Sequence, residues 1–495
     1  MHWIARGGQR TLGASEPAGN PAMTSRIEHD LLGEREVPAA AYWGIHTLRA
    51  RENFPISGTL IGAFPDLVRS LALVKHAAAL TNRDLGDLGP DHAEAIVAAC
   101  REIADGALHE EFVVDVIQGG AGTSTNMNAN EVIANRALEL LGRKKGEYAA
   151  LHPIEHVNRA QSTNDVYPTA LRLASILGIK KLVTQMALLR QAFEAKAFEF
   201  RDILKIGRTQ LQDAVPMTLG QEFSTYAVML GEDEARLTEA LSLMREISLG
   251  ATAIGTGINT DPAYAATACR HLARLSGEPL VLSPNLIEAT QDTGAFVQLS
   301  GVLKRVAVKL SKTCNDLRLL SSGPQAGLNE IRLPERAAGS SIMVGKVNPI
   351  IPEVVNQIAF EVIGNDMTIT MAAEGGQLQL NAFEPMIAWS LFKSVAHLTA
   401  GCATLTDHCV KGITANREVL AARVRDSVGL ATALNPYIGY ENATDIARTA
   451  LATGRRVGDL VIERGLLDAA QLAAILRPEV LTQPHARAVQ LPPQL

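Results

Sequence analysis

The sequence is poor in the features that mark several large classes of protein. It has five cysteines in 495 residues and no C-x-x-C pair, which argues against a disulfide framework. Aromatic residues make up only 4%, and no uninterrupted apolar run approaches the roughly 18 residues of a membrane helix. With 46 basic against 52 acidic residues, the formal charge is −6, which does not suggest a basic surface. We therefore expect a cytoplasmic protein that binds neither nucleic acid nor membranes.

Helical periodicity dominates the middle of the chain. The steps between Ile176, Ile179, Val183, Met186 and Phe193 are three, four, three and seven residues, as expected for one face of a helix. Further segments with this pattern are Leu219–Leu249, Gly294–Leu320, Pro352–Ala373 and Met386–Asp407. We predict a mainly α fold whose centre is a long antiparallel five-helix bundle.

Composition and pattern divide the chain into a three-domain subunit with flexible ends. Residues 1–25 are rich in Gly, Pro and Arg and are predicted to be a disordered extension. Residues 26–163 mix short helices with polar loops, residues 164–415 hold the bundle, and residues 416–477 form a small helical domain. Residues 478–495 contain four prolines and are predicted to be a flexible tail.

Small polar residues interrupt the helical pattern in four segments, which are Gly119–Asn130, Gln161–Asp165, Gly207–Pro216 and Gly339–Glu353. The last contains two serines, a lysine and an asparagine in a loop that leads into a helix near Pro352. Its spacing does not fit a phosphate loop, because five residues separate Gly339 from Gly345 and Val347 follows the lysine. An anion clamp explains this composition better than a plain surface loop does.

The first two polar segments also have a purely structural interpretation. Ser124 or Thr125 could cap the helix that follows the first segment, and Ser162, Thr163 or Asn164 could cap the helix that follows the second. Capping and ligand binding are compatible, because a helix N-terminus favours anions.

The polar segments are rich in hydroxyl and amide groups and poor in the usual acid and base residues. This composition suits the binding of a small molecule with several carboxylates. The sequence has no G-x-S-x-G elbow, which argues against a serine hydrolase. His152 and His156 are four residues apart, but Pro153 disrupts helical geometry between them and no third ligand is evident. We predict no metal site there.

In their order along the chain, these segments resemble the aspartase/fumarase superfamily. GSSIMVGKVNP is similar to the superfamily's signature loop, and HVNRAQSTNDVYPTA and GGAGTSTNMNANE are similar to two further segments. The resemblance covers nearly all of residues 26–475. Gln210 stands where fumarases carry a histidine, which favours the aspartase branch, as does the opening IEHDLLGEREVPAAAYWGIHTLRARENFPISG.

The resemblance implies a homotetramer in which each active site takes polar segments from three subunits. The implied reaction is the reversible deamination of L-aspartate, a small dicarboxylate, to fumarate and ammonia through an enediolate. No cofactor is required, because this elimination needs neither redox chemistry nor an imine. Activation by a divalent cation stays open.

The resemblance also assigns roles to particular residues. Ser340 is implied as the general base, acting as an alkoxide, with Lys346 stabilising its charge and Glu353 supporting the loop. The β-carboxylate, and hence the enediolate, is held by Thr123, Ser162, Thr163 and Ser341. The α-carboxylate is held by Thr209, Lys346 and Asn348, and the amino group faces Asn164 and Gln210. No residue is assigned as a general acid for ammonia.

Two kinds of alternative stay open at this point. A class II fumarase, or a lyase for an N-substituted aspartate, would use the same fold. Gln210 argues against the fumarase, whereas a slightly roomier pocket would admit the substituted amine. A catalytically silent helical scaffold would need none of Ser340, Lys346 and Asn348, so their joint presence argues against that function.

Overall fold

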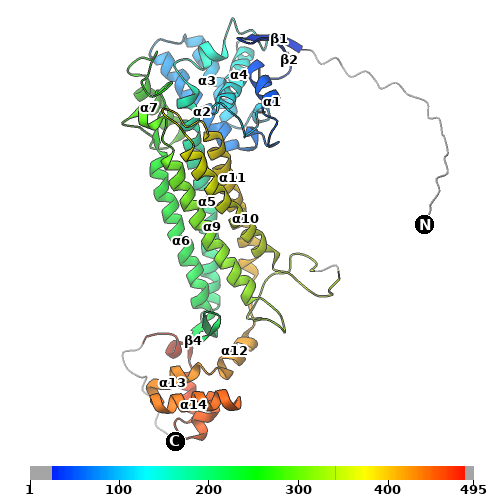
Figure 1. Cartoon of the computed structure of the whole chain (residues 1–495), viewed down its shortest axis with the longest axis vertical. Coiled ribbons are helices and arrows are strands. Elements are labelled where there is room, and N and C mark those ends of the chain that lie inside the picture. The colour runs from blue at the N-terminus through cyan, green and yellow to red at the C-terminus, as the bar shows by residue number, and fades with distance from the viewer. Residues whose placement is uncertain (1–24, 340–341, 485–495) are drawn as a thin grey trace, which may run out of the picture.

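The chain is elongated, with a helical bundle between two smaller ends (Figure 1). The computed structural model describes residues 25–339 and 342–484. The α-helices are α1 (Ile45–Asn53), α2 (Pro65–Asp84), α3 (Pro90–Ala104), α4 (Thr123–Leu140), α5 (Thr163–Glu199), α6 (Leu219–Met244), α7 (Tyr264–Ser276), α8 (Leu286–Ala289), α9 (Gly294–Leu320), α10 (Ile350–Glu374), α11 (Glu384–His408), α12 (Arg417–Asp426), α13 (Leu430–Ile438), α14 (Tyr440–Thr453), α15 (Val457–Glu463), α16 (Ala469–Ile475) and α17 (Pro478–Leu481).

Short turns and two-stranded sheets connect these helices. The 3₁₀ or π turns are η1 (Ile61–Ala63), η2 (His109–Glu111), η3 (Pro153–Val157) and η4 (Val410–Gly412). The antiparallel pairs are β1 (Ser25–Asp30) with β2 (Gly33–Pro38), β3 (Leu204–Thr209) with β4 (Gln212–Thr218), and β7 (Ile331–Arg332) with β8 (Thr414–Ala415). The parallel pair is β5 (Glu246–Ile247) with β6 (Val281–Leu282).

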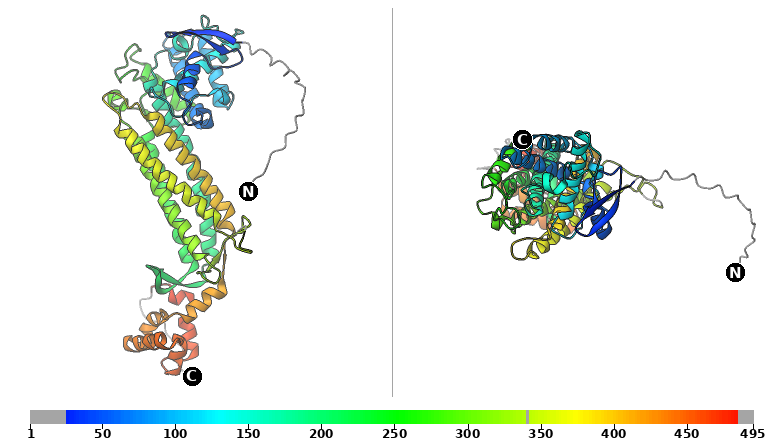
Figure 2. Two further views of the ribbon diagram at one scale, coloured as in Figure 1. Left: turned by 45° about the vertical axis from the view of Figure 1, so that its right-hand side comes forward. Right: turned by 90° about the horizontal axis from the view of Figure 1, so that it is seen from above.

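The predicted five-helix bundle is confirmed, because α5, α6, α9, α10 and α11 lie side by side (Figures 1 and 2). Aromatic rings join α5 to α6, where Phe193 packs edge-on against Tyr226 at a centroid distance of 5.4 Å. The sequence predicts that the second bundle segment continues to Leu249, but α6 ends at Met244. The chain after it pairs with β6, which replaces helical hydrogen bonds with sheet hydrogen bonds.

The N-terminal end of the molecule packs α2, α3 and α4 over one end of the bundle (Figure 1). A buried carboxylate organises this region. Glu131 of α4 accepts hydrogen bonds from the backbone N–H groups of Gly44, His46 and Thr47 at 2.8, 2.8 and 3.1 Å, and from the Thr47 hydroxyl at 2.6 Å. It therefore satisfies donors at the start of α1 that have no helical partner.

At the other end of the bundle, α12–α17 gather beside the β3–β4 hairpin (Figure 1). These helices have their own buried cluster, which includes Leu434, Ile446 and Val461, and Ile206 of β3 belongs to it. The hairpin is therefore packed on the C-terminal helices and at the same time follows directly from the bundle helix α5.

The ends of the chain differ in part from the expected tails. Residues 1–24 and 485–495 lie outside the described residues. Ser25, expected in the extension, instead pairs with Pro38 in the β1–β2 hairpin, and α17 lies in the segment expected as a tail. The remaining domain limits, at residues 163 and 415, stay predictions. No helix of the described chain has the length and apolar character needed to cross a membrane.

Candidate active site

The first polar segment forms the start of α4, but not in the way that the capping prediction assumes. The helix begins at Thr123, and its N-cap is Gly122 with a φ of 90°. A side chain on Gly122 would lie 2.5 Å from the Tyr167 ring, so this position requires glycine both for its backbone angle and for space. The prediction that Ser124 or Thr125 caps α4 is wrong. Thr125 is buried, and its hydroxyl donates to the side chain of Gln118.

The second polar segment forms the start of α5, and here a capping prediction is confirmed. The Ser162 hydroxyl oxygen accepts from the backbone N–H of Asn164 at 3.2 Å, and the Asp165 carboxylate accepts from the Ser162 N–H at 3.0 Å. The Asn164 side-chain amide donates to the carbonyl of Ala253 at 2.7 Å. The first turn of α5 is thus held in place at several atoms.

Asparagine side chains bring the starts of α4 and α5 together. Asn126 of α4 donates through Nδ2 to the Thr163 hydroxyl oxygen at 3.1 Å and to Asn158 Oδ1 at 3.2 Å. Asn130, one turn later in α4, also donates to Asn158 Oδ1, at 3.1 Å. The structure therefore places the predicted residues Thr123 and Ser162–Asn164 in one region of the molecule.

A buried lysine that sequence reasoning missed completes this network. Lys75 of α2 is fully buried, and its Nζ donates to Asn158 Oδ1 at 2.8 Å and to Gln161 Oε1 at 2.9 Å. Its position could have drawn attention to it, because Lys75 follows Leu71 by four residues and precedes Ala78 by three, on the face predicted to be buried. A charged residue on such a face usually has a specific partner.

Burial shifts the pKa values of the two ionisable groups next to this segment. Burial lowers the pKa of Lys75 to about 7, against the opposing attraction of Asp165. Burial likewise raises the pKa of Asp165 to about 6, although backbone N–H groups of Thr252, Ser162 and Gly250 donate to its carboxylate. The Gln161–Asp165 segment thus rests on a buried acid whose pKa is raised and a buried base whose pKa is lowered.

The third polar segment is a β-hairpin at the far end of the bundle. Thr209 ends β3, and the turn residues Gln210 and Leu211 have positive φ angles of 53° and 62°. The Thr209 and Gln210 side chains are exposed at the hairpin tip. Between Thr163 and this hairpin lies α5, whose 37 residues span about 55 Å. The hairpin residues therefore lie far from Thr123 and Thr163 of the same chain.

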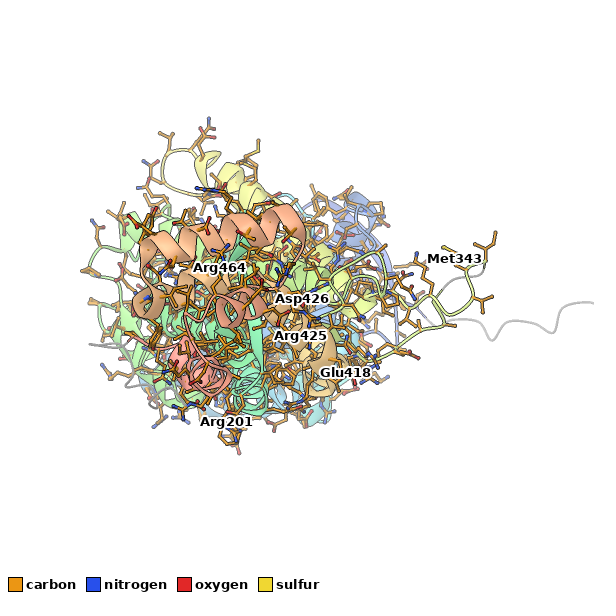
Figure 3. All side chains as sticks on the ribbon, turned by 90° about the horizontal axis from the view of Figure 1, so that it is seen from below. Arg201, Met343, Glu418, Arg425, Asp426 and Arg464 are labelled. Atoms are coloured by element: carbon orange, nitrogen blue, oxygen red, sulfur yellow. The ribbon has the colours of Figure 1, made fainter. Side chains whose placement is uncertain are left out.

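The fourth polar segment is the loop before α10, which projects away from the rest of the molecule. Figure 3 shows Met343 well outside the rest of the molecule, and Ile342 and Val344 are highly exposed. Lys346 is exposed, Asn348 donates through Nδ2 to the Gly339 carbonyl at 3.2 Å, and Glu353 lies in the first turn of α10. Ser340 and Ser341, the predicted base and a predicted carboxylate ligand, lie outside the described residues.

The neck of this loop is formed by a direct backbone contact. A Cβ atom on Gly339 would overlap the carbonyl oxygen of Lys346 and lie 2.8 Å from the backbone N of Val347. Glycine is therefore the residue that allows the two arms of the loop to touch. The same region forms a hollow of about 540 Å³, and its lining includes Glu335, Arg336, Gly339, Met343, Lys346 and Val347.

The structure brings together Thr123, Ser162, Thr163 and Asn164, but not Thr209, Gln210, Lys346 or Asn348 with them (Figure 1). In residues 25–339 and 342–484, no group of three or more His, Cys, Asp or Glu side chains could hold a metal ion. A long helical bundle with hydroxyl and amide groups at both ends, and a glycine-bounded loop before its fourth helix, is the arrangement that the resemblance to the aspartase/fumarase superfamily of lyases implies.

Comparisons with known proteins agree with this class. The model of the family described as "Lyase" matches residues 33–364, and that described as "Fumarase C C-terminus" matches residues 430–483. The chain belongs to this lyase family, in the branch of the aspartate ammonia-lyases. An aspartate ammonia-lyase of Pseudomonas fluorescens is 62% identical over 94% of this chain and 97% of its own length. That of Escherichia coli is 55% identical over 94% and 97%.

A solved structure shows the same fold. It is a fumarate lyase:delta crystallin from Brucella melitensis bound to cobalt, with a TM-score of 0.91 and 57% sequence identity. The match covers 93% of this chain and 100% of that chain. The mainly helical fold expected from the sequence is thereby confirmed.

Proposed function

We propose that this protein catalyses the reversible deamination of L-aspartate to fumarate and ammonia, as a homotetramer whose active sites each combine segments of three subunits. The observation that carries the proposal is the separation of the polar segments by α5, about 55 Å long. Side chains that would bind one small dicarboxylate lie at opposite ends of this helix. Only segments from neighbouring subunits can complete each site.

An apolar stripe on the bundle supports the assembly. Phe360, Ile363, Met367 and Met371 of α10 are spaced by three, four and four residues and so lie on one helix face. They are 63%, 39%, 62% and 68% exposed in the single subunit. Soluble proteins rarely leave such a stripe in water, and a second copy of the same bundle would cover it.

The hydroxyl groups at the start of α5 are suited to the β-carboxylate of aspartate. The capping bond uses a lone pair of Ser162, and Asn126 likewise donates to the oxygen of Thr163. Both hydroxyl protons therefore stay available for a carboxylate. The N-terminus of α5 adds a favourable dipole where negative charge develops on the enediolate. Thr123 and Ser341 complete this carboxylate site in the proposal. The Thr123 hydroxyl donates to the Gly120 carbonyl at 2.7 Å and would exchange that hydrogen bond for one to the carboxylate.

The amino group and the α-carboxylate are assigned to the other side chains. Because the Asn164 amide donates to Ala253, its carbonyl oxygen is oriented to accept from the substrate's ammonium group. Gln210 of a neighbouring subunit supplies a second acceptor. The α-carboxylate is bound by Thr209, Lys346 and Asn348, whose charge and hydrogen-bond donors match an anion.

The proton next to the β-carboxylate is removed by Ser340 in this proposal. A serine hydroxyl is a very weak acid, so its alkoxide requires backbone N–H donors of the loop and the charge of Lys346. Glu353, in the first turn of α10, orients the loop and does not itself take a proton. Closing the loop over the substrate excludes water before the base is formed. No side chain is assigned as a general acid, and the amine leaves as ammonia.

The proposed reaction needs no cofactor, since elimination requires neither an electron carrier nor an imine. We place the protein in the cytoplasm, where the five cysteines, all buried and free of disulfide bonds, would stay reduced.

The experiment is to follow fumarate by its ultraviolet absorbance after mixing the purified protein with L-aspartate, L-malate or N-methyl-L-aspartate in turn. A rise with aspartate alone supports the proposal. Turnover of malate alone would make the protein a fumarase, and turnover of the N-methyl substrate alone would make it a lyase for substituted aspartates. The Ser340→Ala variant should keep the tetramer, measured by sedimentation, and lose turnover. Substantial residual activity would rule out Ser340 as the base.

A further inference from the structure

One buried carboxylate, that of Glu330, joins three cationic side chains beside the β3–β4 hairpin. Its Oε1 accepts from Arg208 at 2.6 Å and from Arg423 at 2.9 Å. Its Oε2 lies 2.9 Å from Nζ of Lys205, which also donates to Glu222 at 2.6 Å. Glu330 is 1% exposed and Lys205 is 2% exposed, so both charges are held away from water.

The backbone of Glu330 is fixed as firmly as its side chain. Its N–H donates to the carbonyl of Leu320 at the end of α9, and its carbonyl accepts from the N–H of Asn416 just before α12. Burial raises the pKa of the Glu330 carboxyl, but the hydrogen bond from Arg208 and the charge of Lys205 outweigh that effect and hold the pKa below its usual value. Glu330 is therefore ionised at neutral pH and attracts all three cations.

The three cationic side chains come from two elements, the strand β3 and the helix α12. Lys205 and Arg208 belong to β3, the strand that ends at Thr209. Arg423 belongs to α12, the first of the C-terminal helices. Glu330 itself lies nine residues before Gly339, the neck of the loop before α10. One carboxylate thus ties together the hairpin, the C-terminal helices and the chain that leads to the loop.

Stability is a weak reason for such an arrangement. Burying an ion pair costs desolvation that often equals its attraction, so apolar residues would serve the core as well. What charged hydrogen bonds provide is a defined position. The strand needs this because its register with β4 shifts between Ile206 and Arg208, next to the exposed tip.

We infer that Glu330 is a positioning residue for substrate binding, which holds the β3–β4 hairpin so that Thr209 and Gln210 are presented to the neighbouring subunit's substrate. This inference rests on the proposed role of Thr209 in binding the α-carboxylate. Glu330 touches no substrate atom and acts through Arg208 and Lys205.

The test is a double-mutant cycle on the full-length protein, with KM and kcat for aspartate as readouts. Thr209→Ala and Glu330→Gln should each raise KM about tenfold, with a smaller change in kcat. If Glu330 acts through the hairpin tip, adding Glu330→Gln to a variant that already carries Thr209→Ala and Gln210→Ala should leave KM unchanged, because the positions of absent side chains no longer matter. A further rise in KM in that background would overturn the inference and leave Glu330 a general structural role.

A matched control is available in the middle of the bundle. Asp233 is 1% exposed and pairs with Arg305 at 2.9 Å and Lys309 at 3.2 Å, but it contacts none of the four polar segments. Asp233→Asn should leave KM unchanged even where it lowers the unfolding temperature. An equal rise in KM for Asp233→Asn would show that any lost buried charge disturbs binding, which overturns the inference.

The remaining outcomes separate the inference from the site assignment. A normal KM in the Thr209→Ala variant would refute the proposed role of Thr209 and with it the inference. A raised KM in Thr209→Ala together with a normal KM in Glu330→Gln would refute the inference alone. If Glu330→Gln does not fold, Arg208→Met removes the tie without leaving an unpaired buried carboxylate. A raised KM in that variant supports the inference, and a normal KM overturns it.

Discussion

The neck of the loop before α10 offers the sharpest prediction, through the substitution Gly339→Ala. In the structure, an added methyl group would overlap the carbonyl oxygen of Lys346. Carbon and oxygen atoms need more than 3 Å between them, so the two arms of the loop must separate by about 2 Å. That shift moves Lys346 and Asn348 relative to Ser340, which follows Gly339 directly.

The expected loss is large in catalysis and small in stability. A misplacement of about 1 Å in a reacting group can cost roughly a hundredfold in rate, so kcat/KM for aspartate should fall at least about a hundredfold. Lys346 and its neighbours in the loop are exposed, so the free energy of unfolding should change by no more than about 0.5 kcal/mol. The assays are fumarate absorbance for turnover and urea unfolding for stability.

Gly345→Ala is the matched control, because it alters the same loop without a clash. Gly345 has a φ of 76° and nothing within 4 Å of the position of an added methyl group. The substitution costs only the backbone strain of a left-handed residue, about 1–2 kcal/mol, and kcat/KM should fall by no more than about tenfold. A Gly339→Ala variant that retains a tenth of the wild-type kcat/KM, or that loses no more than Gly345→Ala does, would refute the reasoning.

Three further predictions concern the buried polar groups at the N-terminal end. Lys75→Met should raise KM for aspartate about tenfold, because Gln161 loses the hydrogen bond from the Lys75 ammonium group that connects the start of α5 to α2. An unchanged KM would contradict this prediction. Glu131→Gln should lower the free energy of unfolding in urea by about 1–3 kcal/mol, because the new NH₂ group, itself a donor, would face a backbone N–H donor at the start of α1. An unchanged free energy of unfolding would show that these N–H groups have other acceptors. Asp165 has a folded-state pKa of about 6, above its ordinary value of 3.8, so the stability it contributes in its protonated form is lost as the pH rises through 6. Between pH 5 and 7.5, the free energy of unfolding of the wild type should therefore fall by about 1.4 kcal/mol relative to that of Asp165→Asn. If the difference in unfolding free energy between the two proteins does not change with pH, the raised pKa of Asp165 is contradicted.

The helices of the bundle could be predicted from sequence because their stability comes from a repeated local pattern. The apolar stripe of α5, from Ile176 to Phe193, faces the core of the bundle. The N-cap residue Ser162 lies only two residues from its hydrogen-bond partner Asn164. Interactions between near neighbours in sequence are visible in the sequence itself.

Features fixed by distant contacts were not predictable in the same way. The cap of α4 is a glycine because the Tyr167 ring packs against it, and that ring lies 45 residues further along the chain. The hairpin turn at Gln210 and Leu211 has left-handed angles without the Asn or Gly that normally indicates such a turn. Glu330 was missed because its partners Lys205 and Arg423 are about a hundred residues away on either side.

The length of α5 has a consequence for mixtures of variants. Under the proposed assembly, a subunit altered at Thr163 still carries an intact hairpin, and a subunit altered at Thr209 still carries an intact α5 start. Two preparations that are each inactive should therefore recover activity when their subunits are unfolded and refolded together, because some sites then draw both intact segments from different chains. Such complementation would arise without repairing either polypeptide, since each supplies the end of the helix that the other lacks.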